Sequence, residues 1–271
     1  MYNVDILHKS CNIRLSTDSV LIYRELYKRL FSIPGGVKQI VNGNVDILIE
    51  FKNDTILINK YGIKHCISLN YTFSEIYPII FSVIYDYFFD IGSIGVHSVL
   101  VSNDNNTYLI VGDFGQGKTT LALELEKIGF KILSCDQTEV KYQNGKILAQ
   151  SGSRLNKISE KFSIIDEFID APRTINGIYK VRGLSYQGYP SFNEITDPTR
   201  KTFNIWPTLT WPWQNPLISG TTSNLGWDLI KAKCFAACKI LSNLPQVELR
   251  GDAKILASMI SDAYFKKNQG E

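Results

Sequence analysis

The sequence predicts an α/β fold with two parts, a small α+β domain over residues 1–90 and a larger α/β domain over residues 91–271. Segments with the alternating apolar pattern of strands are interspersed with segments whose apolar residues recur at helical spacing. In addition, a strand, a glycine-rich loop, a helix and a second strand follow one another between Thr107 and Asp136. We expect the rest of the chain to be organised around this series.

The composition is that of a folded protein without a polyanionic partner. Hydrophobic residues make up 44% of the chain and aromatic residues 12%, which is ample for a packed core and excludes wholesale disorder. The formal charge of +3 comes from 29 basic and 26 acidic residues, with no polybasic run, so we expect neither nucleic-acid nor membrane binding. The longest apolar run, 76–89, contains Pro78 and Asp86 and is too short to span a bilayer.

The cysteines predict reduced thiols. They are odd in number and scattered, and the pair that is four residues apart has no second pair to complete a zinc site. The five residues are Cys11, Cys66, Cys135, Cys234 and Cys238. Because Asp5, His8 and Lys9 interrupt the start of the chain, no secretory signal is expected. We therefore expect a soluble cytoplasmic protein.

Residues 1–90 contain strand and helix patterns but no chemical motif. The expected elements are strands at 4–7 and 11–15 with the pattern of edge strands, a helix at 19–31, a hairpin of strands 46–51 and 55–58, and a helix at 74–89. No cluster of possible metal-ligand or catalytic partners surrounds His8 or His65 in the sequence. Both are therefore interpreted as incidental surface or core residues rather than as ligands. Gly92 and Gly95 are the expected hinge into the larger domain.

The loop Gly112–Thr119 fits the pattern G-x-x-x-x-G-K-[ST] in full. Its glycines are expected to adopt positive φ and to bring backbone N–H groups within reach of phosphate oxygens. A tight strand-to-helix turn would explain the glycines but not the pair Lys118-Thr119, which is suited to the outer phosphates and to Mg²⁺. The sequence therefore predicts a nucleoside triphosphate site. Its expected binding residues are Gly112, Asp113, Phe114, Gly115, Gln116, Gly117, Lys118, Thr119 and Thr120.

The residues after the loop support this interpretation. Leu121, Leu125 and Ile128 recur at helical spacing, and the free N–H groups at the start of that helix favour an anion. Gly129 stands where a glycine commonly ends a helix, and residues 130–133 form the next expected strand.

Residues 95–140 resemble the catalytic core of HPr kinase/phosphorylase and its kinase relatives. The matching features are the strand 96–101 with His97, the G-D-x-G-x-G-K loop with Asp113, the helix sequence L-A-L-E-L, and a strand that ends at Asp136. The resemblance implies a P-loop kinase core of the HPr kinase / PEP carboxykinase-like type, preceded by the small α+β N-terminal domain. It also implies ATP and Mg²⁺ as cofactors, and a homo-oligomer as the assembly.

Two departures from that family bear on the reaction. Cys135 stands where the family has the first aspartate of a pair, which is credited with activating the acceptor hydroxyl, and Thr119-Thr120 stand where it has Ser-Glu. The chain is therefore more similar to HPr-kinase-related kinases that modify peptides or small molecules. A neutral thiol is a poor base, so Cys135 is predicted to be catalytically passive.

Beyond the core, two segments allow alternatives. Phe162–Glu167 fits a helix with Asp166 and Glu167 in solvent, or a Walker B strand. Residues 203–216 hold three tryptophans and three prolines, which argue against a regular helix or central strand and favour a covering loop or a lid over the acceptor. The other expected elements are a hairpin turn at 143–146 with a returning strand 146–150, strands at 174–181 and 245–249, and helices at 228–241 and 252–264. The first of these helices is expected to place Cys234 and Cys238 in the core, and Asp252 is expected to cap the second.

The resulting functional hypothesis is an ATP-dependent kinase that transfers the γ-phosphoryl group to a hydroxyl. A serine of a peptide or carrier protein is the expected acceptor, and a small-molecule hydroxyl is the alternative. Lys118 would bind phosphate, Thr119 and Asp136 the metal, and Asp136, Asp113 or His97 would orient the acceptor. Two other hypotheses are a non-catalytic nucleotide-binding regulator and a P-loop ATPase that uses Asp166 and Glu167.

Overall fold

The structure is a computed structural model of the 271-residue chain. It describes residues 1–38, 43–52, 54–68, 73–103, 106–158, 161–164, 169, 171–184, 189–214 and 226–269. The mixture of helices and sheets confirms the α/β class expected from the sequence.

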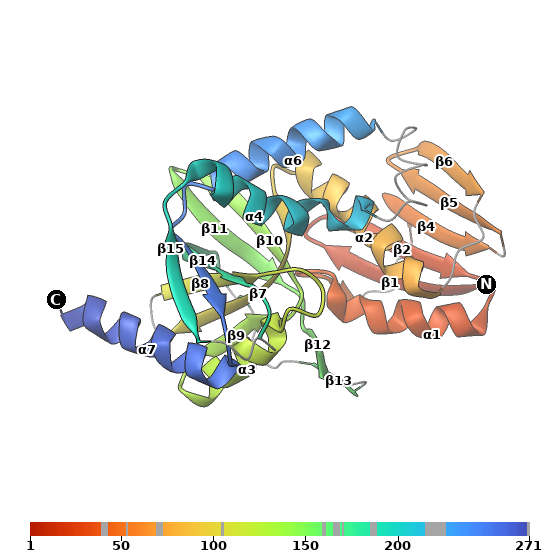
Figure 1. The fold of residues 1–271 in the computed structure, drawn as a ribbon. Coiled ribbons are helices and arrows are strands. Elements are labelled where there is room, and N and C mark those ends of the chain that lie inside the picture. The colour runs from red at the N-terminus through yellow and green to blue at the C-terminus, as the bar shows by residue number, and fades with distance from the viewer. Residues whose placement is uncertain are drawn as a thin grey trace.

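The first quarter of the chain forms a six-stranded sheet with the order β3-β1-β2-β4-β5-β6 (Figure 1). Its strands are β1 (Tyr2–His8), β2 (Cys11–Thr17), β3 (Val37–Lys38), β4 (Ile47–Lys52), β5 (Thr55–Lys60) and β6 (Ile63–Ser68). The expected hairpin of β4 and β5 is confirmed. The expectation that the first two strands are edge strands is wrong, because β3 and β4 pair on their outer sides. The alternating burial of β1 and β2 comes from one covered face of the sheet.

An eight-stranded sheet follows, with the order β11-β10-β7-β8-β14-β16-β15 and with β9 paired to β7. Its strands are β7 (Ile94–Asn103), β8 (Asn106–Val111), β9 (Lys131–Ser134), β10 (Gln137–Gln143), β11 (Lys146–Gly152), β14 (Arg173–Val181), β15 (Ser191–Ile195) and β16 (Gln246–Arg250). The strands β8, β14 and β16 are parallel, so their carboxyl ends meet at one edge. The expected turn between β10 and β11 is confirmed at Asn144 and Gly145, both at positive φ.

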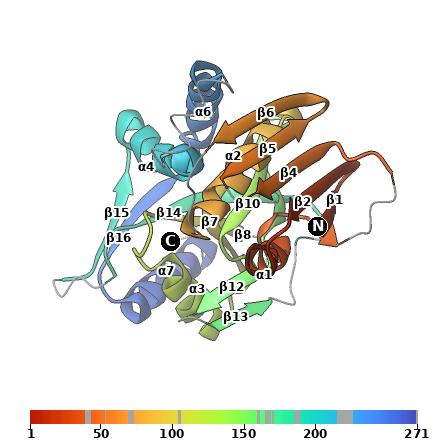
Figure 2. The same ribbon diagram turned by 90° about the vertical axis from the view of Figure 1, so that its right-hand side faces the viewer.

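The helices cover both faces of this larger sheet (Figures 1 and 2). They are α2 (Phe73–Asp90), α3 (Lys118–Lys127), α4 (Pro198–Thr210), α6 (Trp227–Leu241) and α7 (Ala253–Gln269). The helix α1 (Val20–Arg29) packs instead on β1 and β2 of the six-stranded sheet, and short 3₁₀ helices form at η1 (Leu30–Ser32) and η2 (Trp211–Trp213). The helices α3 and α7 share a hydrophobic core with one face, and α2, α4 and α6 share a core with the other. In both views α2 lies between the two sheets.

The close contact of α2 with β7 depends on Gly95. The structure places Gly95 inside β7 rather than in a linking loop, and a Cβ there would lie 2.3 Å from the Tyr85 ring of α2. Gly92, at a φ of 71°, forms the turn between the two elements. One continuous core joins the six-stranded sheet, α2 and the larger sheet, and the division at residue 90 stays a prediction.

The tryptophan-rich segment corrects an expectation, because residues 198–210 form the helix α4. Asp197 caps it by accepting a hydrogen bond from the Thr199 N–H at 2.8 Å, and Pro198 occupies the first turn, where its missing N–H costs nothing. Pro207 does remove an internal hydrogen bond, at a cost of about 3 kcal/mol. Full burial of Ile205 and Leu209 offsets that cost, since each buried side chain contributes about 1.5–3 kcal/mol. Residues 215 and 216 lie outside the described residues.

The segment after residue 160 corrects a second expectation. Residues 161–164 form β13 (Lys161–Ile164), which pairs with β12 (Leu155–Ile158) in a two-stranded ribbon and not in a helix. The helix was expected because Phe162, Ile165 and Ile169 recur at helical spacing, whereas Phe162 and Ile164, two residues apart, have the spacing of one face of a strand. The antiparallel pairing with β12 supplies the hydrogen bonds between the two short strands. Asp166 and Glu167 lie outside the described residues.

The remaining sequence expectations for the C-terminal third are confirmed. Asp252 accepts hydrogen bonds from the N–H groups of Lys254 and Ile255 and so caps α7. Cys234 and Cys238 are fully buried on one face of α6, and all five cysteines are free thiols. In the described part of the chain, the helices are all too short or too polar to cross a membrane.

His8 is a core residue, one of the two placements expected for it, and it belongs to a buried polar network around Glu139 of β10. The Glu139 carboxylate accepts hydrogen bonds from Lys9 Nζ at 2.5 Å, Ser93 Oγ at 2.7 Å, Ser151 Oγ at 2.7 Å and His8 Nε2 at 3.3 Å. Burial raises the pKa of this carboxyl, but hydrogen bonds from His8, Lys9 and Ser93 outweigh burial and hold the pKa near 2. The network ties β1 to β10 across 131 residues of sequence.

This network predicts acid sensitivity. The Glu139 pKa falls from an ordinary 4.5 to about 2 on folding, so its stabilisation is complete above pH 4.5 and is lost as the pH falls towards 2. At 1.36 kcal/mol per pKa unit this is about 3 kcal/mol of unfolding free energy. Glu139→Gln should therefore lower stability at neutral pH and flatten the stability curve between pH 4.5 and 2, as measured by urea unfolding. An unchanged slope in that window would show that other carboxyls cause the acid sensitivity.

Candidate active site

The glycine-rich loop connects the end of β8 to the start of α3, as expected. Gly115 and Gly117 have φ values of 73° and 92°, which only glycine adopts readily. Gly112 does not adopt positive φ, contrary to expectation. Its role is close approach, because a Cβ there would lie 2.9 Å from the backbone oxygen of Val181 in β14. The loop is thus held against the neighbouring strand.

The start of α3 offers free backbone donors at the end of this loop. Gly117 is the N-cap residue, and it has no side chain to occupy the first N–H groups. The helix dipole places partial positive charge at the same end. Loop and helix together therefore form an arrangement suited to an anion.

Lys118, the first residue of α3, is largely buried beside the loop. Its ammonium group donates hydrogen bonds to the backbone oxygens of Gly112 at 2.9 Å and Asp113 at 3.3 Å. Burial lowers its pKa to about 8, against the opposing effect of the Asp136 charge. The side chain is thus directed into the loop and not into the hydrophobic core.

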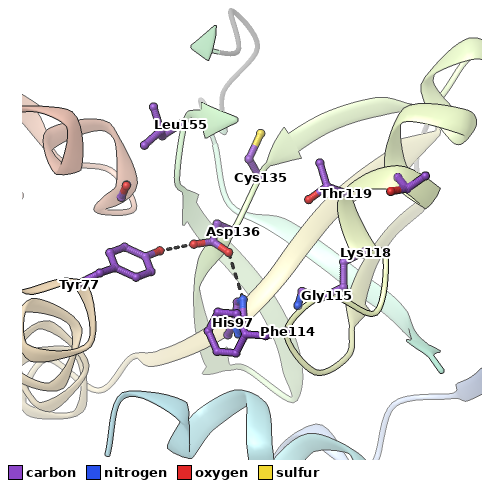
Figure 3. A pocket seen from close by; sticks show the side chains of 12 residues that line it. Tyr77, His97, Phe114, Gly115, Lys118, Thr119, Cys135, Asp136 and Leu155 are labelled. Atoms are coloured by element: carbon purple, nitrogen blue, oxygen red, sulfur yellow. Dashed lines mark hydrogen bonds and ion pairs between the residues drawn. The ribbon is translucent and has the colours of Figure 1, made fainter. Parts of the chain in front are cut away.

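A cavity of about 560 Å³ opens beside the loop (Figure 3). The sequence-predicted residues that line it are His97, Phe114, Gly115, Gly117, Lys118, Thr119, Thr120 and Asp136. Ser32, Tyr77, Cys135 and Leu155 complete the lining. The fold therefore brings together loop, helix start and Asp136 in one space.

Asp136 lies with Cys135 in the short connection between β9 and β10, and both of its carboxylate oxygens are engaged (Figure 3). Oδ1 lies 3.1 Å from His97 Nε2, and Oδ2 accepts a hydrogen bond from the Tyr77 hydroxyl. Burial raises its pKa, but the charge and hydrogen bond of His97 and the hydrogen bond of Tyr77 outweigh burial and hold the pKa near 2. The carboxylate is therefore ionised at every physiological pH.

His97, on β7, is held in an apolar and aromatic environment on its other side. Its ring centroid lies 4.6 Å from that of Phe114 and 5.3 Å from that of Trp211, and the residue is only 3% exposed. Burial lowers the pKa of His97, and the Asp136 charge only partly counteracts this. A neutral imidazole that orients Asp136 is the state these surroundings favour.

Tyr77, which sequence reasoning missed, belongs to a hydrogen-bonded chain that ends at Asp136. Trp211 Nε1 donates to the Tyr85 hydroxyl at 3.2 Å, and Tyr85 donates to the side chain of Gln137. Gln137 Nε2 then donates to the Tyr77 hydroxyl at 3.0 Å, and Tyr77 donates to Asp136. The spacing of Tyr77 and Tyr85 on one face of α2 is visible in the sequence, but nothing local indicates what that face contacts.

We expect Tyr77 to position Asp136 rather than to bind nucleotide. Tyr77→Phe should lower the rate of transfer about tenfold, because it removes one hydrogen bond to the carboxylate while keeping the ring that packs on Phe81 and Trp211. Nucleotide affinity should stay within about twofold of wild type. Turnover and ATP affinity measured in parallel test this. A variant with unchanged turnover would show that His97 alone fixes Asp136.

Cys135 is buried, and its surroundings agree with the expected passive role. Burial, and then the charges of Asp136 and Glu126, raise its pKa to about 12, so the thiol is neutral. Figure 3 shows its sulfur directed away from the Asp136 carboxylate. Cys135→Ser should therefore keep forward activity within about threefold, and Cys135→Asp should add some base function. A Cys135→Ser variant that binds ATP normally and transfers nothing would contradict this expectation.

Three expected site residues, Gly112, Asp113 and Gln116, are not brought into the cavity lining. The Asp113 side chain is 61% exposed, and its carboxylate lies 3.5 Å from Lys180 Nζ. The Gln116 side chain accepts a hydrogen bond from the Gly183 N–H, which ties the loop to the end of β14. Asp113 therefore does not line the cavity with Asp136 and His97, although the sequence suggests all three as candidates to orient the acceptor.

The residues present fit a magnesium ion bound together with a nucleotide. No cluster of three or more His, Cys, Asp or Glu residues that could hold a metal ion exists in the described parts of the chain. The Thr119 hydroxyl and the Asp136 carboxylate line the same cavity. Magnesium is typically bound by one or two such oxygen ligands plus phosphate oxygens and water.

No family model matches the chain, and no curated protein matches it. Among solved structures, the chain is similar to the Hpr(Ser) kinase/phosphatase from Coxiella burnetii, with 13% identity and a TM-score of 0.37. The match covers 64% of this chain and 98% of that chain. At this identity and TM-score the likeness concerns fold alone.

Proposed function

We propose that this protein is a Mg²⁺- and ATP-dependent kinase that transfers the γ-phosphoryl group to a hydroxyl acceptor. The observation that carries the proposal is the meeting of three features in one cavity. These are the glycine-rich loop with Lys118, the Thr119 hydroxyl at the start of α3, and the ionised carboxylate of Asp136. Phosphoryl transfer requires mainly positioning and neutralisation of charge, which this set of groups supplies.

Each residue has a defined task in the proposed reaction. The backbone amides of the loop and the Lys118 ammonium bind the phosphates. Thr119 and Asp136 would hold the magnesium ion, directly or through water, and a bound magnesium ion neutralises phosphate charge. His97 and Tyr77 fix the Asp136 carboxylate by hydrogen bonds to its two oxygens.

The acceptor hydroxyl would be oriented by Asp136. As its oxygen forms the bond to the γ-phosphorus and the bond to the leaving ADP oxygen breaks, the hydroxyl proton passes to the carboxylate. A carboxylate with a pKa near 2 is a weak base, so this transfer would occur late, when the attacking oxygen has become strongly acidic. Cys135 takes no part, because its thiol is neutral.

A motor ATPase has less support than transfer. That function would require an Asp-Glu strand beside β8, yet the strands that pair with β8 in the described residues are β7 and β14. The strand β13 pairs with β12 instead. A non-catalytic regulator is the second candidate, and its support is Cys135 in place of an acidic residue.

The direct test is incubation with Mg²⁺-ATP and two sets of acceptors, serine and threonine peptides and small alcohols, followed by mass analysis. We expect one added phosphoryl group on a member of the peptide set. A product in the alcohol set alone would make the protein a small-molecule kinase. Bound ATP without product in either set would favour the regulator.

A further inference from the structure

Lys180 is a buried lysine at the end of β14, the strand beside the glycine-rich loop. It pairs in register with Val111, the last residue before the loop, and it is only 2% exposed. Its neighbours Tyr179 and Val181 pack into the core under α3 and α7. By strand alternation, Lys180 faces the opposite side of the sheet, the side covered by α4. Lysine is almost never fully buried unless it is paired.

The pairing of Lys180 is weak for a buried charge. In the described part of the chain its partner is the Asp113 carboxylate, whose Oδ1 lies 3.5 Å from Lys180 Nζ. The Asp113 side chain is 61% exposed. The cross-strand residue Glu248 is occupied elsewhere, because its oxygens lie 2.8 Å from Arg182 Nε and 3.0 Å from Arg200 and from Arg250. Buried ammonium groups need close and complementary partners. Burial lowers the pKa of Lys180, and the charges of Asp113 and Glu248 only partly counteract this.

Lys180 and Lys118 lie on two sides of the start of the glycine-rich loop. Lys180 pairs in register with Val111, and the Lys118 ammonium donates a hydrogen bond to the backbone oxygen of the next residue, Gly112, at 2.9 Å. Two ammonium groups beside one anion-binding loop are unfavourable on their own and favourable with a polyanion between them. Lys180 stands at the carboxyl edge of the parallel strands, where ligands of open α/β sheets bind.

We propose that Lys180 is a second cation for the triphosphate, which exchanges its ion pair with Asp113 for phosphate oxygens when the nucleotide binds. The proposal rests on the proposed function, since it assumes that the loop binds a nucleoside triphosphate. In this arrangement Asp113 holds the ammonium group in place without catalysing the reaction. The triphosphate is then bound by Lys118 from the helix side of the loop and by Lys180 from the β14 side.

The experiment compares Mg²⁺-ATP affinity by calorimetry in four variants. Lys180→Met keeps the length of the side chain and removes the charge, so affinity should fall at least about tenfold, or about 1.4 kcal/mol. Lys180→Arg should stay within about threefold, because the cation is retained. Asp113→Asn should bind more tightly than wild type, since the carboxylate that competes with phosphate for Lys180 is gone. Lys146→Met, at an exposed lysine that starts β11, controls for the loss of one charge and should bind as wild type.

A purely structural ion pair gives the opposite pattern. In that case Lys180→Met and Asp113→Asn would lower the unfolding temperature alike and leave affinity unchanged, which would overturn the proposal. If Lys180→Met does not fold, Asp113→Asn decides, because unchanged or weaker binding in that variant would also overturn it. A third outcome is that wild type binds Mg²⁺-ATP, Lys118→Ala does not, and Lys180→Met binds it as tightly as wild type. That result would refute the role of Lys180 and leave the proposed function standing. A wild type that binds no nucleotide would refute both.

Discussion

Lys118→Ala is expected to weaken triphosphate binding at least about a hundredfold without unfolding the protein. The Lys118 ammonium lies at the loop, within 2.9 Å of the Gly112 oxygen, and makes no contribution to the hydrophobic core. Charge-assisted hydrogen bonds to phosphate are among the strongest in proteins, and alanine removes all of them at this position. The loss should appear as missing stabilisation by Mg²⁺-ATP in a thermal unfolding experiment, where a ligand at a hundred times its Kd contributes about 2.7 kcal/mol.

Lys127→Ala is the matched control for this variant. Lys127 belongs to the last turn of the same helix, its side chain is 67% exposed and it pairs with Glu124. We expect that variant to be stabilised by Mg²⁺-ATP as strongly as wild type. If Lys118→Ala is stabilised to the same extent, the nucleotide does not bind at this loop.

Asp136→Asn should lower transfer by about a thousandfold while nucleotide affinity stays within about fivefold. Asparagine keeps the size of the side chain and an oxygen for the Tyr77 hydroxyl, but it loses the negative charge that would bind metal and acceptor. The effect should therefore fall on kcat. Single-turnover transfer and equilibrium ATP binding, measured on the same preparation, separate the two quantities.

The control for Asp136→Asn is Asp228→Asn, at a fully exposed carboxylate in the first turn of α6. It should transfer at the wild-type rate. Equal turnover in Asp136→Asn and wild type would show that another carboxylate performs this task. Asp166, outside the described residues, would then be the first alternative to examine.

The parts of the fold that depend on residues close together in the sequence could be predicted from the sequence. The path from β8 through the loop to α3 and Gly129 follows from glycine conformation and helical spacing, and the structure confirms it. The role of Gly112 could not be predicted. A glycine is needed there because the backbone oxygen of Val181 lies too close for a Cβ, and no local sequence pattern indicates that contact.

The polar contacts between distant segments could not be predicted. Tyr77 meets Asp136 across 59 residues, and His8 meets Glu139 across 131. In both pairs one partner lies in a segment without a recognisable motif, and the sheets bring it to the other. Only the three-dimensional packing of α2 between the two sheets specifies these contacts.

The segment around Trp206 shows the limit of counting residue types. The prolines of this segment predict a break in any helix. Pro198 nevertheless stands in the first turn of α4, where proline is tolerated, and the burial of Leu209 and Trp211 offsets the free-energy cost of Pro207. Position within the element and burial decided the outcome, and neither is available from composition.

The measurement that tests the central claim most directly is ADP formation from Mg²⁺-ATP as a function of acceptor concentration. Kinase activity predicts that ADP forms in a one-to-one ratio with phosphorylated acceptor, that its rate rises with acceptor, and that Lys118→Ala and Asp136→Asn abolish it. ADP that forms at the same rate without any acceptor, or ATP that binds and is never turned over in the presence of an acceptor set, would contradict phosphoryl transfer as the function of this site.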